Sequence, residues 1–309
     1  MSASWNTSLG IRRKGICAGA AFLLVAISCV GRAGAEETAP AHAAGPMLSV
    51  GEIVQRNAAA RGGIDAWHAL NTLSEKGRIE HGQMKGPKSR HGSAGKDEAV
   101  NSIPFTLEIK RPHKMRVEMN VGDATAVQMF DGTHGWTLEP SAKGVIVREF
   151  GDAEAAAAAD QVDPEGPLLN AAAKGTTVRL DGTDVVEGRR AYRLLLTLRK
   201  GEVRHVWIDA ETFLDLKVDG TRAIDGRGWS VETYFYDWHG VAGVKIPYRI
   251  ETAVGDVRTS TRLLVDRALV NVPISDESFG LPADVARSAK PVASATKSAN
   301  GLAQNGGKP

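Results

Sequence analysis

The chain has 309 residues, with 38 Lys or Arg against 36 Asp or Glu, so its formal net charge is only +2. No basic stripe with interleaved aromatic residues occurs, which excludes a nucleic-acid-binding protein of the usual kind. The only two cysteines, Cys17 and Cys29, lie near the start of the chain, so the rest must be held together by an apolar core rather than by disulfides.

Residues 1–35 have the features of an export signal. Arg12, Arg13 and Lys14 form a basic start, residues 16–30 are apolar but too short to span a bilayer comfortably, and Ala35 ends a small-residue cleavage site. We expect cleavage near Ala35 and a periplasmic protein. Loss of four basic and no acidic residues changes the net charge to −2. Residues 36–46, rich in Ala, Pro and Glu, are predicted to be a linker.

An alternative for the same segment is a lipid anchor. Residues 26–29 loosely resemble a lipobox, in which the cysteine is acylated and becomes the first residue. Alanine stands where leucine is usual, three residues before Cys29. If Cys29 is acylated, the protein would be an anchored outer-membrane acceptor.

The folded part is predicted to open with two helices. Ser49 and Glu52 form a capping box, and Gly62-Gly63 ends the first helix because glycine adopts left-handed conformations cheaply. A short second helix is expected over residues 65–70, with Trp67 and Leu70 packing on a sheet.

A long series of strands follows, each showing apolar residues in alternation with polar ones. A polar, glycine-rich loop at residues 81–102 separates the first two, and turn residues separate the others. The expected strands cover residues 73–81, 105–110, 114–120, 125–130, 135–139, 145–150, 178–186, 190–198, 203–208, 213–220, 228–238, 244–252 and 256–270.

Two alanine-rich helices are expected in the middle of this series, over residues 153–159 and 167–173. Together they would be either a lid or an ordinary crossover between sheet halves. We therefore predict a mainly β protein with a helical lid, built as a half-open antiparallel β-barrel of about 11–13 strands. Its single domain covers residues 47–282, and residues 283–309 form a disordered tail.

Several short motifs resemble those of the LolA/LolB-type outer-membrane lipoprotein carriers and their relatives. Lys110-Arg111-Pro112 precedes a strand, and Asp131-Gly132 then leads to Trp136. Ala60-Arg61-Gly62-Gly63 and the strand pair over residues 234–250 resemble a carrier-like subgroup. The resemblance spans about residues 47–282. The long loop, the alanine-rich segment and the overall length depart from the family pattern and leave the ligand open.

The resemblance implies an apolar cavity that holds acyl chains, with Arg111 tying the lid and controlling ligand entry. Without the resemblance, Arg111 is equally a hairpin arginine before a turn-forming proline. The apolar strand residues are either ordinary core or the lining of that cavity. The candidate ligand-binding residues are Phe105, Leu107, Ile109, Met115, Val117, Met119, Val127, Met129, Trp136, Leu138, Leu194, Leu196 and Leu198.

No sequence pattern indicates an enzyme, a metal site or a cofactor. The histidines are scattered, and there is no H-E-x-x-H motif, nucleophile elbow or phosphate loop. We predict a monomeric periplasmic carrier for lipoprotein acyl chains or another lipid, passing cargo from an inner-membrane donor to an outer-membrane acceptor protein. The alternatives are the Cys29-anchored acceptor and an envelope sensor or scaffold that binds proteins through the same groove.

Overall fold

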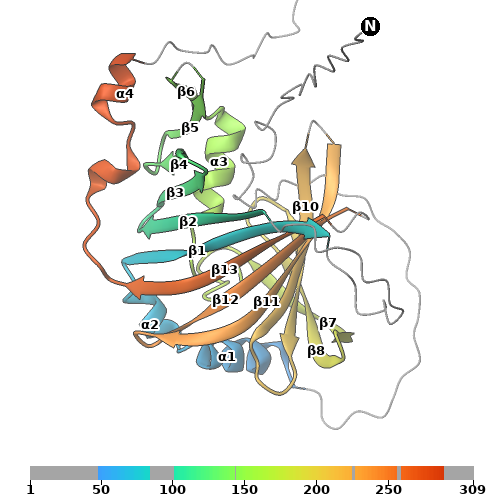
Figure 1. Cartoon of the computed structure of the whole chain (residues 1–309). Helices are drawn as coiled ribbons and strands as arrows, with labels where there is room; N and C mark the ends of the chain where they lie inside the picture. Colours follow the sequence, from blue (N-terminus) through green and yellow to red (C-terminus); the bar gives the residue numbers. More distant parts are fainter. Residues whose placement is uncertain (1–47, 84–100, 143, 225–226, 256–258, 289–309) are drawn as a thin grey trace, which may run out of the picture.

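The computed structural model describes residues 48–83, 101–142, 144–224, 227–255 and 259–288 (Figure 1). The predicted signal peptide and linker lie outside these ranges, as do Cys29, most of the predicted 81–102 loop and residues 289–309 of the predicted tail.

The first helix begins and ends at the predicted signals. α1 (Val50–Ala60) follows Ser49, whose hydroxyl accepts a hydrogen bond from the Glu52 amide, while the Glu52 carboxylate accepts one from the Ser49 amide. This confirms the capping box. Beyond the helix, Gly62 has a φ of +109°. A Cβ there would lie 2.1 Å from the carbonyl oxygen of Gly243, so glycine lets two backbones touch.

The second helix brings an aromatic side chain into the core. α2 (Ile64–His68) starts directly after Gly63. Trp67 and Leu70 are both buried in the largest apolar cluster of the described residues. Their predicted packing on the sheet is confirmed.

Within the described residues, thirteen antiparallel strands form one sheet, as the alternation predicts. Strand boundaries agree with the prediction to within a few residues. The strands are β1 (Thr72–Gln83), β2 (Asn101–Lys110), β3 (Lys114–Val121), β4 (Ala124–Phe130), β5 (Gly135–Ser141), β6 (Gly144–Glu149), β7 (Thr177–Val186), β8 (Arg189–Thr197), β9 (Val203–Asp209), β10 (Asp215–Ile224), β11 (Arg227–Val241), β12 (Val244–Val254) and β13 (Thr259–Val270).

The sheet is open at both sides. Its strand order is β6-β5-β4-β3-β2-β1-β13-β12-β11-β10-β9-β8-β7. The chain therefore runs from the centre to one edge, crosses to the other edge and returns to the centre. There β1 and β13 pair, with Leu73 opposite Val270. The curved sheet with unpaired edges β6 and β7 is the predicted half-open barrel (Figure 1).

Helices α1, α2 and α3 (Asp152–Gln161) share one face of this sheet, which we call the inner face. The main cluster joins Trp67 with residues of β1, β2 and β3 and with Ala158 of α3. A second cluster joins Ile53 of α1 with Leu194 and other residues of β7 to β10. Apolar packing on the inner face thus fixes the helices against the strands.

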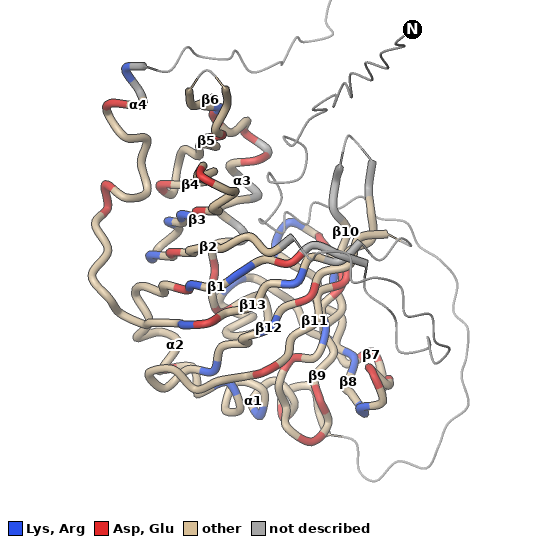
Figure 2. Tube along the Cα trace, in the orientation of Figure 1, with Lys and Arg blue, Asp and Glu red and all other residues tan. Residues whose placement is uncertain are grey.

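The opposite, outer face is polar over most strands and covered at one end. Acidic and basic residues are interspersed along the strands (Figure 2), as in the ion pairs of Arg262 with Glu251 and Arg78 with Asp266. Beside β3 and β4, a C-terminal segment of η2 (Asp276–Phe279) and α4 (Ala283–Ser288) supplies apolar cover instead.

Two predicted boundaries are wrong. Residues 167–173 do not form a second α-helix: residues 164–175 make successive turns, and Asn170 within the predicted helix has a φ of +54°, which a right-handed helix does not accommodate. The disordered tail was predicted from residue 283, but residues 283–288 form α4, whose Val285 packs against the sheet. No helix in the described ranges is long and apolar enough to cross a membrane.

Candidate functional site

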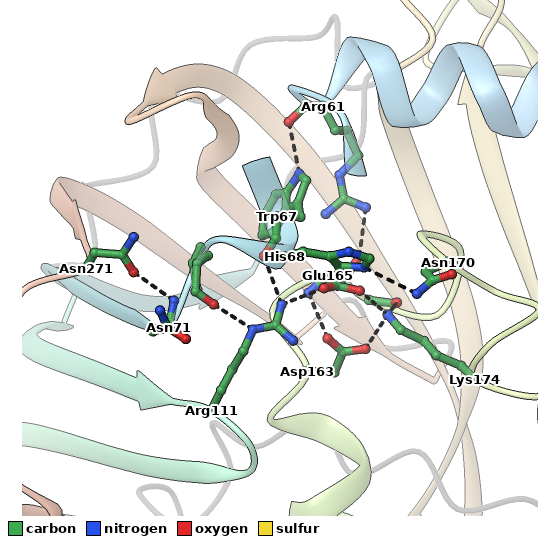
Figure 3. Close-up of polar contacts among 12 residues, drawn as sticks. Arg61, Trp67, His68, Asn71, Arg111, Asp163, Glu165, Asn170, Lys174 and Asn271 are labelled. Carbon is green, nitrogen blue, oxygen red and sulfur yellow. Dashed lines mark hydrogen bonds and ion pairs between the residues drawn. The ribbon is translucent and has the colours of Figure 1, made fainter. Parts of the chain in front are cut away.

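Arg111 lies in the hairpin between β2 and β3 and fastens three parts of the chain together (Figure 3). Its Nε donates to the carbonyl oxygen of Leu70 at 2.6 Å, and its Nη2 donates to that of Trp67 at 3.1 Å. The same Nη2 forms an ion pair with Glu165 Oε1 at 2.5 Å. The planar guanidinium suits this fork of acceptors. We call these three bonds the latch.

Glu165 belongs to the segment that covers the inner face between the sheet edges. We call residues 152–175, which comprise α3 and the turns after it, the cover segment. The Glu165 side chain is only 4% exposed and also pairs with Lys174 at 3.0 Å. Lys174 in turn contacts Asp163 and donates to the Gly166 carbonyl (Figure 3). Ion pairs and hydrogen bonds thus hold the cover segment together, and Arg111 joins it to the β2–β3 hairpin.

The carboxylate of Glu165 is held in its charged form. Burial by itself would raise its pKa, but hydrogen bonds from Lys174 and Arg111, with their positive charges, outweigh burial and lower the pKa below its ordinary value. The latch therefore stays ionised at neutral pH. Because the folded-state pKa is depressed, its contribution to stability is present at neutral pH and is lost as the pH falls through that pKa.

A second arginine, Arg61, reaches the cover segment from the end of α1. Its Nη1 donates to the carbonyl oxygen of Glu165 at 2.9 Å, and its Nε lies 3.6 Å from a carboxylate oxygen of Asp215. Its guanidinium lies 4.9 Å from the ring centre of Trp67 and 5.8 Å from that of Trp238. Burial lowers the pKa of Arg61, opposed by the neighbouring carboxylates. The sequence reasoning quoted Arg61 within a motif but gave it no role.

The predicted apolar ligand residues do not share one surface. Six lie in the main inner cluster, namely Phe105, Leu107, Ile109, Met115, Val117 and Met119. Three lie in the inner cluster beneath α1, namely Leu194, Leu196 and Leu198. Four lie in a separate cluster with Leu281 and Val285 of the C-terminal segment, namely Val127, Met129, Trp136 and Leu138.

The expectation that those last four residues line the inner face is therefore wrong. Alternation along β4 assigns Ala126 and Phe130 to the inner cluster, so Val127 and Met129 must point the other way. Alternation shows which residues share a face, and only the packing shows which face carries the helices.

The inner face also carries a carboxyl group, Glu75, that the sequence reasoning overlooked. It lies on β1 between Leu73 and Gly77 and is only 6% exposed. A break in the apolar alternation of β1 at residue 75 was the available signal. Burial raises its pKa from 4.5 to about 7.

The polar groups around Arg111 are arranged to hold the cover segment against the sheet. Arg111, Lys174 and Arg61 surround Glu165, and Asn170 Nδ2 lies 3.3 Å from His68 Nε2. Within the described ranges, no group of three or more His, Cys, Asp or Glu side chains is placed to hold a metal ion.

Comparison with solved structures finds several distantly similar chains. A LolA superfamily protein from Nitrosomonas europaea is 13% identical, with a TM-score of 0.49 over 76% of this chain and 99% of the other. A DUF1329 family protein from Desulfovibrio piger is 15% identical, with a TM-score of 0.48 over 76% and 98%.

An outer membrane lipoprotein-sorting protein domain from Vibrio parahaemolyticus is 11% identical, with a TM-score of 0.46 over 74% of this chain and 94% of the other. No protein-family model matches the chain, and no curated protein matches it in sequence. At these low identities and TM-scores, its function has to be inferred from its own geometry.

Proposed function

We propose that this protein is a non-enzymatic periplasmic carrier that binds the acyl chains of lipoproteins, or of a related lipid, on its inner face. The observation that carries the proposal is the way this face is closed. No strand pairs across the opening between β6 and β7 in the described sheet. The cover segment closes over the inner face and is fastened by the Arg111 latch to Glu165.

α3, the helical part of the cover segment, packs on the strands through small side chains. α3 is mostly alanine, and its apolar contribution to the main cluster comes from Ala155, Ala158 and Ala159, with Val162 after it. Small side chains bury little area, so few apolar contacts oppose separation of α3 from the strands, whereas Leu168 and Leu169 hold the turns after it in the inner clusters. The strand ladders do not depend on this segment and would stay intact when it moves.

An acyl chain could replace α3 on the inner face. Each methylene group that leaves water contributes about 0.8 kcal/mol, so a lipid chain offsets the loss of the alanine contacts. Methionines such as Met115 and Met119 have unbranched side chains that adapt to different apolar shapes. Binding would then consist of burial, and hand-over would consist of releasing the chain to another apolar surface.

This mechanism supports transfer between envelope membranes. Cargo would come from an inner-membrane donor protein and pass to an outer-membrane acceptor, with the predicted signal peptide removed near Ala35. Mass analysis of the N-terminus of the exported protein checks the location. A start at Glu36 supports the free carrier, whereas an acylated Cys29 supports the anchored acceptor.

The direct test is to extract the native protein with solvent, identify bound lipids by mass spectrometry and titrate the delipidated protein with a fluorescent acyl probe. We expect a co-purifying acyl lipid and saturable probe binding. Absence of both would contradict the proposed function.

The latch has its own test in the variant Arg111→Leu. Hydrogen bonds to charged groups contribute roughly 1.5–3 kcal/mol, so loss of the latch should speed release of the acyl probe about tenfold or more. Stopped-flow dilution of the probe-loaded protein measures this rate.

Arg78→Leu is the matched control. Arg78 lies on the outer face and pairs with Glu80 and Asp266. This variant should release the probe at the rate of the unaltered protein. Equal release rates for Arg111→Leu and Arg78→Leu would show that the latch does not govern ligand exit.

A further inference from the structure

Glu75 points toward the helices from the middle of the sheet. In the continuous register between β1 and β2, Leu73 faces Ile109, Glu75 faces Leu107, and Ile79 faces Ile103. All of these partners belong to the main inner cluster or pack against it. Because alternate residues of a strand share a face, Glu75 lies on the inner face with them.

The immediate surroundings of Glu75 are apolar on both sides. Its partner across β13 is Ala268, which is buried in the same cluster as Leu107. Two residues along β1, on the same face, is Gly77, where a Cβ would lie 1.9 Å from the backbone carbonyl oxygen of Leu264 and 3.0 Å from the Phe105 ring. The carboxyl group of Glu75 therefore stands among side chains that are apolar.

No cation of the described residues neutralises Glu75. Burial is the cause of its raised pKa, and none of the hydrogen bonds or ion pairs around it involves its carboxyl group. The basic side chains near the inner face are engaged elsewhere. Arg111 and Lys174 pair with Glu165, and Arg61 pairs with Asp215.

A buried carboxylate without a partner is costly, and it gains most from a ligand that brings a positive charge. A ligand with a neutral hydroxyl group would bind equally well to an uncharged side chain at this position. An ammonium group gains a charge-assisted hydrogen bond in a water-poor site, where such bonds are strong.

We propose that Glu75 selects amphiphiles that carry a primary ammonium group beside an alkyl or acyl chain. The chain would lie along the inner face, and the ammonium would donate to the Glu75 carboxylate. This inference rests on the proposed function, since it assumes that apolar chains enter the inner face. It adds the class of head group that the site prefers.

The test compares three probes of equal chain length, dodecylamine, dodecanol and dodecanoate, below their micelle-forming concentrations. Their affinities for the delipidated full-length protein are measured at pH 8 by displacement of a fluorescent acyl probe. We expect dodecylamine to bind roughly tenfold or more tightly than dodecanol, the effect of one charge-assisted hydrogen bond. Dodecanoate should bind most weakly.

The variant Glu75→Gln keeps the shape of the side chain and removes its charge. We expect it to bind dodecylamine and dodecanol equally, while dodecanol binding stays within about twofold of the unaltered protein. Asp266→Asn is the matched control, because it removes one negative charge from the exposed outer face. That variant should keep the preference for dodecylamine.

The outcomes separate the two proposals. If dodecanol binds and dodecylamine binds no better to the unaltered protein, the head-group inference fails while the carrier function stands. Retention of the preference in Glu75→Gln also overturns the inference. If none of the three probes binds, the carrier function itself fails, and the inference with it.

Discussion

Arg111 and Arg61 hold Glu165 from two directions, one through its side chain and the other through its backbone carbonyl. Only the first contact ends on a charged oxygen, and Arg111 also bonds the carbonyls of Trp67 and Leu70. The resemblance to the carriers implied an arginine that ties a lid. In this chain the arginine is Arg111, and its guanidinium binds the carboxylate of Glu165 in the cover segment. Its other two hydrogen bonds go to carbonyl groups of α2 and of the residues that follow α2.

Because Glu75 is buried, we expect the free energy of unfolding to depend on pH in an unusual way. Its pKa is raised from 4.5 to about 7 in the folded protein, so the folded state holds the proton more tightly than the unfolded chain. Ionisation of the group therefore costs nothing at low pH, and it lowers stability as the pH rises from about 4.5 to about 7. Above that range the cost is constant.

We expect Glu75→Gln to raise the free energy of unfolding by up to about 3 kcal/mol at pH 8 and to change it little at pH 4. Urea denaturation at the two pH values measures both. An equal effect at pH 4 and pH 8 would mean that Glu75 is not a buried titrating group.

At the scale of elements, α3 packs on the main cluster through small side chains. Its packing on the main cluster depends on alanines, and Ala158 is only 1% exposed. A small residue here lets the cover segment approach the strands closely. Under the proposed function, the same small size would let α3 separate from the inner face once the latch opens.

Substitution of Ala158 by Leu tests this close approach. Overpacking of a tight site costs about 1–3 kcal/mol, which should displace the cover segment rather than unfold the sheet. We expect faster amide hydrogen exchange in α3, with β2 and β3 unchanged. Ala283→Leu, at an exposed position of α4, is the matched control. Unchanged exchange in α3 would show that the helix is not closely packed.

At the scale of the whole molecule, the two faces of the sheet have separate apolar clusters. The inner clusters hold the helices, and the outer cluster is covered by the C-terminal segment. Arg116 donates to the Ser278 carbonyl there, and Phe279 is fully buried. The outer cluster should therefore contribute to stability without taking part in ligand binding.

The variant Phe279→Ala checks this division. Truncation of a buried phenylalanine costs about 3–5 kcal/mol, so the free energy of unfolding should fall by about that amount. The acyl-probe affinity of the still-folded protein should remain unchanged. Loss of probe binding in folded Phe279→Ala would mean that the two faces are coupled.

Much of this architecture follows from local sequence patterns. The thirteen strands, the capping box at Ser49 and the end of α1 before Gly62 were all predictable. Each depends on interactions within a few residues, such as side-chain alternation, capping and glycine geometry. The helix predicted over residues 167–173 failed because Asn170, in its middle, adopts a left-handed conformation that ends right-handed helical geometry.

The sequence by itself determined that the chain is a series of amphipathic strands with Arg111 in a hairpin between two of them. Only the tertiary structure decided that Val127 and Met129 face outward, that Glu165 receives Arg111 and that Glu75 lies among apolar groups. The physical reason is separation along the chain. A period of two fixes the alternation within a strand, whereas the choice of face and the partners of a charge depend on segments brought together by folding.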